Sequence, residues 1–298
     1  MSVLGQEQAL CPADSARAES AFNEGMKQMN QSTPSNAVIW RVDERGVAYI
    51  TLNRPQVYNA YNGDLIAALL TAFDKLAGEP LRAAVITGAG RNFQAGADVK
   101  WLDTVRRASP QDNLRASRMT AEAIQRLNTL PIPTVALVQG ACFGGGTGIV
   151  AACDIVIAAD NAIFSIAEVR IGVAGTIIIP QLNDAIGVRQ VRRYALTAER
   201  FDVKEAHRIG LVHEIVPLAD LEGAGERVVD HLLANGPEAI AQTKACALGL
   251  ASSNLEDDTF AGLIESHAAK RQSEEAAEGF ASFLEKRPAR WNPTQKPT

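Results

Sequence analysis

The chain has 298 residues, and 29 Lys and Arg against 34 Asp and Glu give a net charge of −5. Hydrophobic residues make up 47% and charged residues 21%, as in a folded globular protein of one large domain or two small ones. The acidic balance argues against a general nucleic-acid binder, because phosphate contacts need clustered Lys and Arg. No apolar run reaches the roughly 18 residues of a membrane span.

The first 36 residues differ from the rest. They are polar, they lack the apolar stretch of a secretory signal, and their acidic residues are untypical of a mitochondrial transit peptide. The four cysteines form no Cys-x-x-Cys pair, which favours free thiols in a reducing compartment. We therefore expect a cytoplasmic protein with an extension over residues 1–36, an α/β core over 37–220 and a helical region over 221–298.

Short β-rich runs alternate with helical stretches from residue 37 onward. Strands are expected at residues 47–52, 83–87, 134–138 and 154–158. Helices are expected at residues 64–76, at 113–130 and from the glycine cluster to residue 152. This alternation predicts an α/β architecture with buried parallel strands. Beyond Leu218 the pattern is helical, with helices expected at residues 221–233, 237–250, 257–269 and 273–285.

The strongest local signal is segment 140–148, Gly-Ala-Cys-Phe-Gly-Gly-Gly-Thr-Gly, between a predicted strand and a predicted helix. Its glycines let a ligand touch the main chain, and they leave the first N–H groups of the helix free to face negative charge. A tight strand-to-helix turn with close packing is the simpler alternative.

The same glycine spacing also occurs in the nucleotide loop of short-chain dehydrogenases. That family needs a Tyr-x-x-x-Lys pair, and none of the four tyrosines has Lys four positions later. A dinucleotide loop also usually follows the first strand of its domain, whereas this one lies in the middle of the chain. Asp160, near the end of the next strand, would suit a ribose-binding acid, so this alternative stays open.

A second loop, residues 92–100, also follows a predicted strand and contains the small-residue turn Ala95-Gly96-Ala97. Two main-chain N–H groups from separate loops can clamp one carbonyl oxygen and stabilise an enolate or oxyanion. Removing one such donor typically costs about 3–4 kcal/mol.

These two loops, in this order, resemble the crotonase (enoyl-CoA hydratase/isomerase) superfamily. The segments Leu-Asn-Arg-Pro at 52–55, Asn-Ala at 59–60, Ala-Ala-Cys-Asp-Ile at 151–155 and Gly-Leu-Val at 210–212 strengthen the resemblance. It implies a ClpP-like spiral of ββα units with a helical C-terminal region that forms a homotrimer or a dimer of trimers. It also implies an acyl-CoA thioester as substrate, with no metal or redox cofactor, since coenzyme A is part of the substrate.

The resemblance places the two N–H donors at Ala97 and Gly145. It places substrate contacts around them at Ala95, Gly96, Asp98, Gly144, Gly148 and Gly172.

Members of the hydratase branch have two glutamates, and this chain has one of them. Gly148 occupies the first position and Glu168 the second. An apolar run precedes Glu168, which predicts a desolvated carboxyl with a raised pKa. The alternative is a surface glutamate paired with Arg170. After Gly172 the chain is bulky and apolar where the family commonly has a glycine-rich turn, which implies a more apolar acyl site with less room for water.

Three functions fit this pattern. The first is an enoyl-CoA hydratase with Glu168 as its single acid/base. The hydroxycinnamoyl-CoA hydratase/lyases look like a precedent, and segments 168–172 and 194–201 are similar to bacterial methylglutaconyl-CoA-type hydratases. The second is a Δ3-Δ2-enoyl-CoA isomerase, which needs one carboxylate. The third comprises a lyase, a thioester hydrolase and a non-catalytic acyl-CoA binder.

The phosphates of coenzyme A need local bases, and Arg54 and Lys100 are the candidates beside the loops. The resemblance adds Phe280 and Lys286 from the C-terminal region, often supplied by a neighbouring subunit; an ordinary amphipathic helix is the alternative. The four histidines form no close metal pair, and no Gly-x-Ser-x-Gly elbow is present.

Overall fold

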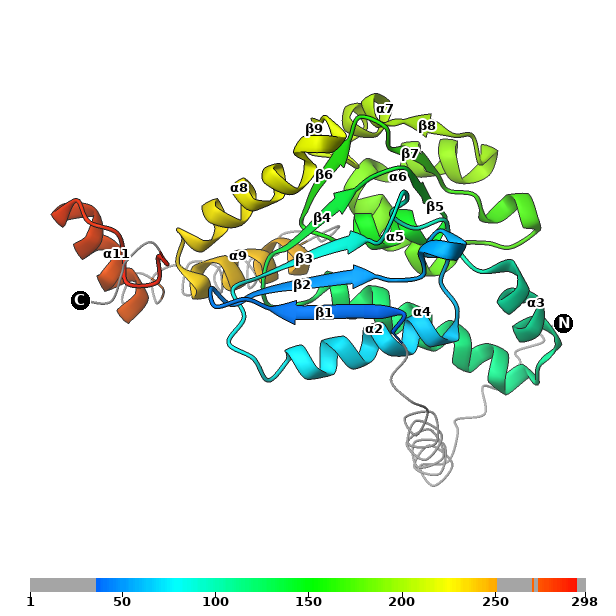
Figure 1. Cartoon of the computed structure of the whole chain (residues 1–298), viewed down its shortest axis with the longest axis horizontal. Coiled ribbons are helices and arrows are strands. Elements are labelled where there is room, and N and C mark those ends of the chain that lie inside the picture. The colour runs from blue at the N-terminus through cyan, green and yellow to red at the C-terminus, as the bar shows by residue number, and fades with distance from the viewer. Residues whose placement is uncertain (1–35, 251–269, 271–272, 294–298) are drawn as a thin grey trace, which may run out of the picture. The chain divides into compact units, whose positions relative to one another are not determined.

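The computed structural model describes residues 36–250, 270 and 273–293 (Figure 1). The predicted extension, apart from Asn36, and the helix expected at 257–269 lie outside the described residues. The described residues from Ala37 onward belong to one compact unit.

A six-stranded sheet in the order β1-β2-β3-β4-β6-β9 forms the centre of this unit. Only β1 is antiparallel to its neighbour, and every other pair is parallel, as the alternation of strands and helices predicts. The strands are β1 (Val38–Val42), β2 (Val47–Leu52), β3 (Ala83–Gly88), β4 (Thr134–Val138), β6 (Ile155–Ala159) and β9 (Glu214–Val216).

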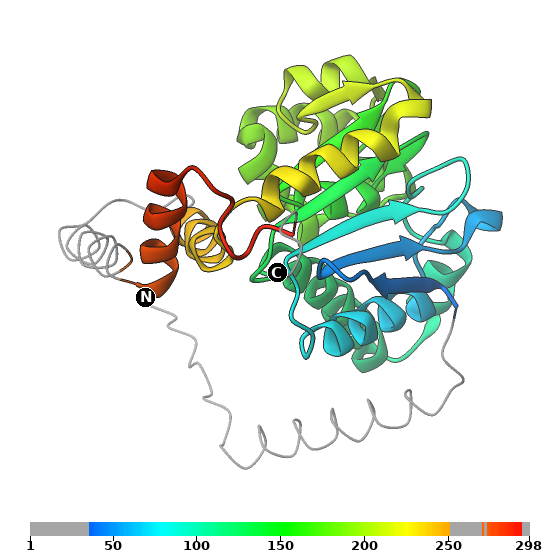
Figure 2. The same cartoon turned by 60° about the vertical axis from the view of Figure 1, so that its left-hand side comes forward.

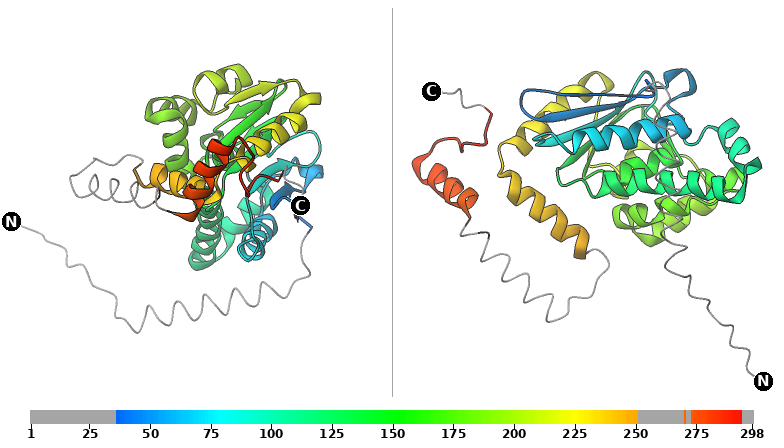
Figure 3. Two further views of the ribbon diagram at one scale, coloured as in Figure 1. Left: turned by 90° about the vertical axis from the view of Figure 1, so that its left-hand side faces the viewer. Right: turned by 90° about the horizontal axis from the view of Figure 1, so that it is seen from below.

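Helices cover both faces of this sheet, so successive residues of a strand enter different cores. On β3, Ala84 and Ile86 pack in the cluster of α2 (Gly63–Leu76) and α4 (Pro110–Asn128). Val85 packs in the cluster of α8 (Leu221–Leu233). Figure 2 shows α8 across one face, and Figure 3 shows α2 and α4 side by side on the other. Burial on both faces explains why these strands read as continuous apolar runs.

A second sheet, β5-β7-β8, lies beyond the carboxyl ends of the central strands (Figure 1). Its strands are β5 (Ala141–Phe143), β7 (Ile163–Ser165) and β8 (Phe201–Asp202). Around it lie α3 (Val99–Arg107), α5 (Gly145–Ala151), η2 (Glu168–Ile171), η3 (Thr176–Ile178), α6 (Ile179–Thr197) and α7 (Val203–Arg208). The short helices η1 (Pro55–Val57) and η4 (Leu218–Asp220) lie in connections.

Several predicted boundaries differ from the structure, and side-chain hydrogen bonds explain two of them. Helix α4 begins at Pro110 rather than at residue 113, because the Ser109 hydroxyl accepts the Asp112 N–H and proline suits the first helical position. Strand β6 begins at Ile155, since the Asp154 carboxylate accepts the Thr134 N–H and hydroxyl. The predicted bounds of β2, β4 and α8 are confirmed.

The C-terminal region contains α9 (Pro237–Leu250) and α11 (Glu274–Glu285). Glu275 of α11 accepts the first free N–H groups of α9, those of Glu238 and Ala239. The Arg82 guanidinium donates to the main-chain oxygens of Trp291 and Leu233. The bond to Trp291 holds the segment after α11 near the amino end of β3.

Helix α9 is tied to the core by an ion pair. Lys244 Nζ lies 2.7 Å from Asp154 Oδ2 and donates to the Ile132 carbonyl oxygen, and its side chain is only 8% exposed. Asp154 thus fixes the turn before β6 and also anchors this helix.

Lys244→Ala should lower the free energy of unfolding by about 1–3 kcal/mol, because it leaves Asp154 and the Ile132 carbonyl without their charged donor. Urea unfolding measures this loss. Lys75→Ala, at an exposed lysine of α2, is the control and should change stability by less than about 0.5 kcal/mol. Equal effects of the two substitutions would show that the Lys244 pair does not stabilise the fold.

Candidate active site

Three loops meet beyond the carboxyl ends of β2, β3 and β4, and a buried asparagine joins the first two of them. The Asn59 amide donates to the main-chain oxygens of Ala89, Asn92 and Phe93, at 2.9, 2.9 and 3.1 Å. Asn59 has a φ of 56°, a conformation that asparagine tolerates better than most residues. The carboxyl edge of a parallel sheet is where ligands of α/β proteins generally bind.

The first predicted donor, Ala97, lies in a loop whose neighbouring main-chain groups are hydrogen-bonded. Tyr61 N–H donates to the Gly96 carbonyl and the Asp98 N–H donates to the Tyr61 carbonyl, so these bonds bracket Ala97. The Gly96 N–H donates to Gln94 Oε1 at 2.8 Å. The Ala97 N–H itself donates to no described residue. Its neighbours therefore fix its direction and leave it free for a ligand.

The second predicted donor, Gly145, is the first residue of α5. Gly144 before it has φ 51° and ψ −121°, which strongly favours glycine, and its N–H donates to the Ser165 carbonyl. Within the described part of the chain, the Gly145 N–H has no acceptor. A β-carbon on Gly96 would lie 3.3 Å from the Phe143 carbonyl oxygen and 3.9 Å from the Gly144 Cα atom. The two donor loops thus touch through their main chains.

The Glu168 carboxyl lies against the Gly145 loop. A β-carbon on Gly144 would lie 3.0 Å from Glu168 Oε1, and one on Gly175 would lie 3.0 Å from its Cδ atom. Glu168 Oε2 is buried without a hydrogen-bond partner among the described residues. Burial raises the pKa of Glu168, and main-chain N–H groups of residues 167 and 168 oppose it only in part. Arg170 donates to the Ala198 carbonyl instead of pairing with Glu168.

At Gly148 an apolar side chain fills the space. A β-carbon there would lie 2.2 Å from the Cγ2 atom of Ile178 and 2.8 Å from its Cβ atom. Ile178 is buried at the end of η3, within the apolar segment that follows Gly172. Ile178 therefore covers the position where the hydratase branch carries its other glutamate.

The predicted coenzyme A bases differ in their surroundings. Arg54 donates to the Ala60 carbonyl and pairs with Asp98 at 3.2 Å, so its charge is already matched. Lys100 is exposed and forms no ion pair within the described chain. Gly172 ends η2 with a φ of 71° and faces open space.

Phe280 and Lys286 do not join the other predicted site residues within one chain. Phe280 is exposed on α11, and Lys286 directly follows this helix. The segment around them is hydrogen-bonded to Arg82, just before β3 begins, whereas the donor loops lie beyond the strand ends. A contact between these two residues and this site therefore requires a second copy of the chain.

Three residues of the site escaped the sequence analysis. Tyr61 lies with its ring against Gly145, Gln94 orients the Ala97 loop, and Ile178 covers Gly148. Burial, together with the charge of Glu168, raises the pKa of Tyr61 to about 12. The position of Tyr61 directly after the Asn59-Ala60 motif was the available signal.

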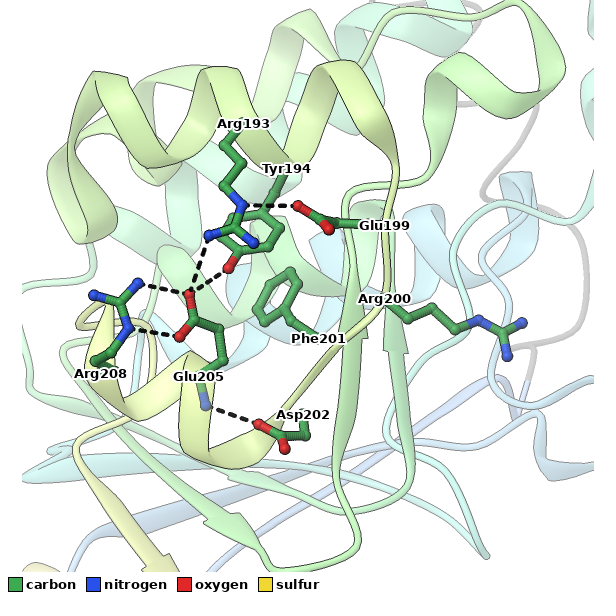
Figure 4. A pocket seen from close by; sticks show the side chains of 8 residues that line it. All are labelled: Arg193, Tyr194, Glu199, Arg200, Phe201, Asp202, Glu205 and Arg208. Carbon is green, nitrogen blue, oxygen red and sulfur yellow. Dashed lines mark hydrogen bonds and ion pairs between the residues drawn. The ribbon is translucent and has the colours of Figure 1, made fainter.

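A separate hollow of about 440 Å³ lies over α6, β8 and α7 (Figure 4). Four of its charged side chains are paired, Arg193 with Glu199 and Arg208 with Glu205. Hydrogen bonds from Arg208 and Tyr194 lower the pKa of Glu205 to about 2. Ala97, Gly145 and Glu168 do not line this hollow.

In the part of the chain that the structure describes, no helix is long and apolar enough to cross a membrane. The same residues contain no group of three His, Cys, Asp or Glu side chains placed to hold a metal ion.

Comparison with known proteins identifies the family of this chain. The family pattern for enoyl-CoA hydratase/isomerase matches residues 43–294. The mevalonyl-coenzyme A hydratase of Aspergillus fumigatus is 32% identical over 260 residues, covering 84% of this chain and 92% of that protein. The hydroxycinnamoyl-CoA hydratase-lyase of Pseudomonas fluorescens is 33% identical over 207 residues, covering 67% and 74%.

A crystal structure of an enoyl-CoA hydratase from Shewanella pealeana shares the fold. It matches with a TM-score of 0.82 at 32% identity, and the match covers 90% of this chain and 98% of that chain. The resemblance that the loops predict is therefore confirmed, and the chain, with its crotonase fold, belongs to the enoyl-CoA hydratase/isomerase family.

Proposed function

We propose that this protein is an enoyl-CoA hydratase that adds water to a 2-enoyl-CoA thioester with Glu168 as its single acid/base. One observation carries the proposal: the desolvated carboxyl of Glu168 lies against Gly144, next to two main-chain N–H groups that the protein leaves free. A buried, unpartnered carboxylate oxygen is unfavourable in a resting protein, so its place beside free donors indicates a ligand or water as its partner.

In this mechanism the Ala97 and Gly145 N–H groups hold the thioester oxygen. The Glu168 carboxylate takes a proton from water while the water oxygen bonds to C3. The C2–C3 electron pair shifts toward the thioester and forms an enolate, whose negative oxygen the two N–H groups stabilise. Glu168, now protonated, returns its proton to C2. The raised pKa of Glu168 helps both halves of this transfer, because it moves the carboxyl toward the pH range where a group both accepts and donates a proton.

An isomerase is the second candidate, and Ile178 favours it. A water molecule in a protein cavity needs two to four polar partners. The side of the site at Gly148 offers the apolar Ile178 instead of a second carboxylate. In the isomerase, Glu168 takes a proton from C2 of a 3-enoyl-CoA and returns it at C4, without added water.

Named relatives support both chemistries on this fold. Two relatives, at 32 and 33% identity, are named mevalonyl-coenzyme A hydratase and hydroxycinnamoyl-CoA hydratase-lyase. A Dictyostelium discoideum relative at 26% identity is named a dienoyl-CoA isomerase. We therefore infer a CoA thioester as the substrate, with Lys100 as a base near it and with Phe280 and Lys286 contributed by a second copy in a trimer or hexamer.

Glu168→Gln should lower kcat about 10²- to 10⁴-fold, the usual contribution of a general acid/base. Crotonyl-CoA, 3-methylglutaconyl-CoA and a 3-enoyl-CoA are the substrates to assay. Hydration removes the conjugated enoyl absorbance, whereas isomerisation of the 3-enoyl thioester creates it, so the sign of the change identifies the reaction. Glu79→Gln, at an exposed glutamate, is the control and should keep full activity. Full activity of Glu168→Gln, or a wild-type protein inert on all three, would refute a single-carboxylate enzyme.

The same substitution should change how stability depends on pH. Because burial raises the pKa of Glu168, the folded chain holds this proton more tightly than the unfolded chain does. The resulting stabilisation is complete below the unfolded pKa of about 4.3 and is lost as pH rises through the raised folded value. Glu168→Gln lacks this loss, so its free energy of unfolding relative to wild type should increase from about pH 4.5 toward pH 8 in urea titrations. A constant difference would contradict a desolvated Glu168.

Gly148→Glu tests whether Ile178 excludes the second glutamate. The substitution alone should destabilise the fold by about 1–3 kcal/mol, because its β-carbon overlaps Ile178. Adding Ile178→Ala removes the closer overlap, the one with Cγ2, so the double variant should be more stable than the sum of the single effects predicts. Thermal unfolding of the four proteins measures this coupling, and strict additivity would show that the two positions do not compete for space.

A further inference from the structure

We propose that Tyr61 is a positioning residue for the thioester site, whose main chain and ring together set the spacing between the Ala97 and Gly145 donors. The inference rests on the proposed role of these two N–H groups. It concerns a residue that carries no chemistry of its own and that makes contact with both donor loops.

The main chain of Tyr61 holds the first donor. Its N–H donates to the Gly96 carbonyl at 2.9 Å, and its carbonyl accepts the Asp98 N–H at 2.8 Å. These bonds flank Ala97 on both sides and make a β-bridge between Tyr61 and Ala97. Ala97 therefore has a fixed orientation relative to the Tyr61 backbone.

The ring of Tyr61 holds the second donor. A β-carbon on Gly145 would lie 2.6 Å from Tyr61 Cε1 and 3.1 Å from Cδ1, so the ring packs directly on the glycine main chain. The ring also meets Trp101 edge-on, with ring centroids 5.8 Å apart. Trp101 belongs to α3, which Asp98 caps immediately after Ala97. The ring thus contacts both the helix that follows the first donor and the helix that begins with the second.

These two ring contacts matter because two donors stabilise an oxyanion only at the correct separation. Misplacement of catalytic groups by about 1 Å can lower a rate about 100-fold. A flexible aliphatic side chain at position 61 would leave α5 free to shift, whereas an aromatic ring is stiff and fills the space. The hydroxyl is not required for this role, since it forms no hydrogen bond within the described chain.

Polarisation of a bound thioester measures donor spacing without turnover. In the inactive Glu168→Gln protein, bound cinnamoyl-CoA should show a red-shifted absorbance, because the two N–H groups draw electron density toward the thioester oxygen. Adding Tyr61→Ala should remove most of this shift at saturating ligand, and adding Tyr61→Phe should retain it. Trp40→Ala, at an exposed ring of β1, is the matched control and should retain the shift.

Turnover provides the second measurement. In the otherwise unchanged enzyme, Tyr61→Ala should lower kcat about 10- to 100-fold with a smaller change in KM, and Tyr61→Phe should restore most of the loss. If Tyr61→Ala does not fold, Trp101→Leu removes the ring contact with Tyr61 and should reduce both the red shift and kcat.

The outcomes separate the two proposals. No red shift in the Glu168→Gln protein would refute the thioester site itself. A red shift that survives Tyr61→Ala, or Trp101→Leu if that variant replaces it, would overturn only the role of Tyr61. A Tyr61→Phe protein as impaired as Tyr61→Ala would assign the effect to the hydroxyl and would also overturn the positioning role.

Discussion

The site depends on one contact, in which the main chains of two loops touch at Gly96 and Gly144. A side chain at either position would meet the other loop within 3.3 to 3.6 Å, so any larger residue would move the donors apart. Side chains elsewhere hold the contact in place. The Asn59 amide joins the loops after β2 and β3. The Gln94 side-chain oxygen accepts the Gly96 N–H, and the Ser165 carbonyl accepts the Gly144 N–H. Donors held this rigidly need no reorganisation when charge develops on a thioester.

The sequence predicts strands, helices and loops that have a local residue pattern. It does not predict contacts between side chains that are distant in the sequence. Strand β4 and helix α8 follow from apolar periodicity, and the loops at Gly96 and Gly144 follow from small residues after strands. Ile178 over Gly148 joins residues from different elements, and no local pattern encodes that contact. Arg54 shows the same limit, since its charge alone could not reveal that Asp98 already pairs with it.

The burial of the Glu168 carboxyl suits its proposed acid/base role but lowers the stability of the fold. Its Oε2 atom is buried without a protein partner, and its ionised form is disfavoured by the same apolar surroundings that raise its pKa. A fold tolerates such a group only if the structure around it cannot relax. Here the carboxyl packs close to Gly144 and Gly175, where an added β-carbon would lie 3.0 Å from it. The unfavourable burial is local, while the large apolar core supplies the stability.

In both proposed reactions Glu168 is the acid/base, so the choice between hydration and isomerisation would depend on the residues near Gly148. A second carboxylate would hold water against C3, but Ile178 presents methyl groups there. An apolar wall favours the carbon chain of a substrate over a free water molecule, since water without polar partners is poorly retained. Hydration then requires the water to be held by Glu168 itself, whose Oε2 atom still lacks a partner. We therefore infer that the segment from Gly172 to Ile178, more than the acid/base, decides between the two proposed reactions.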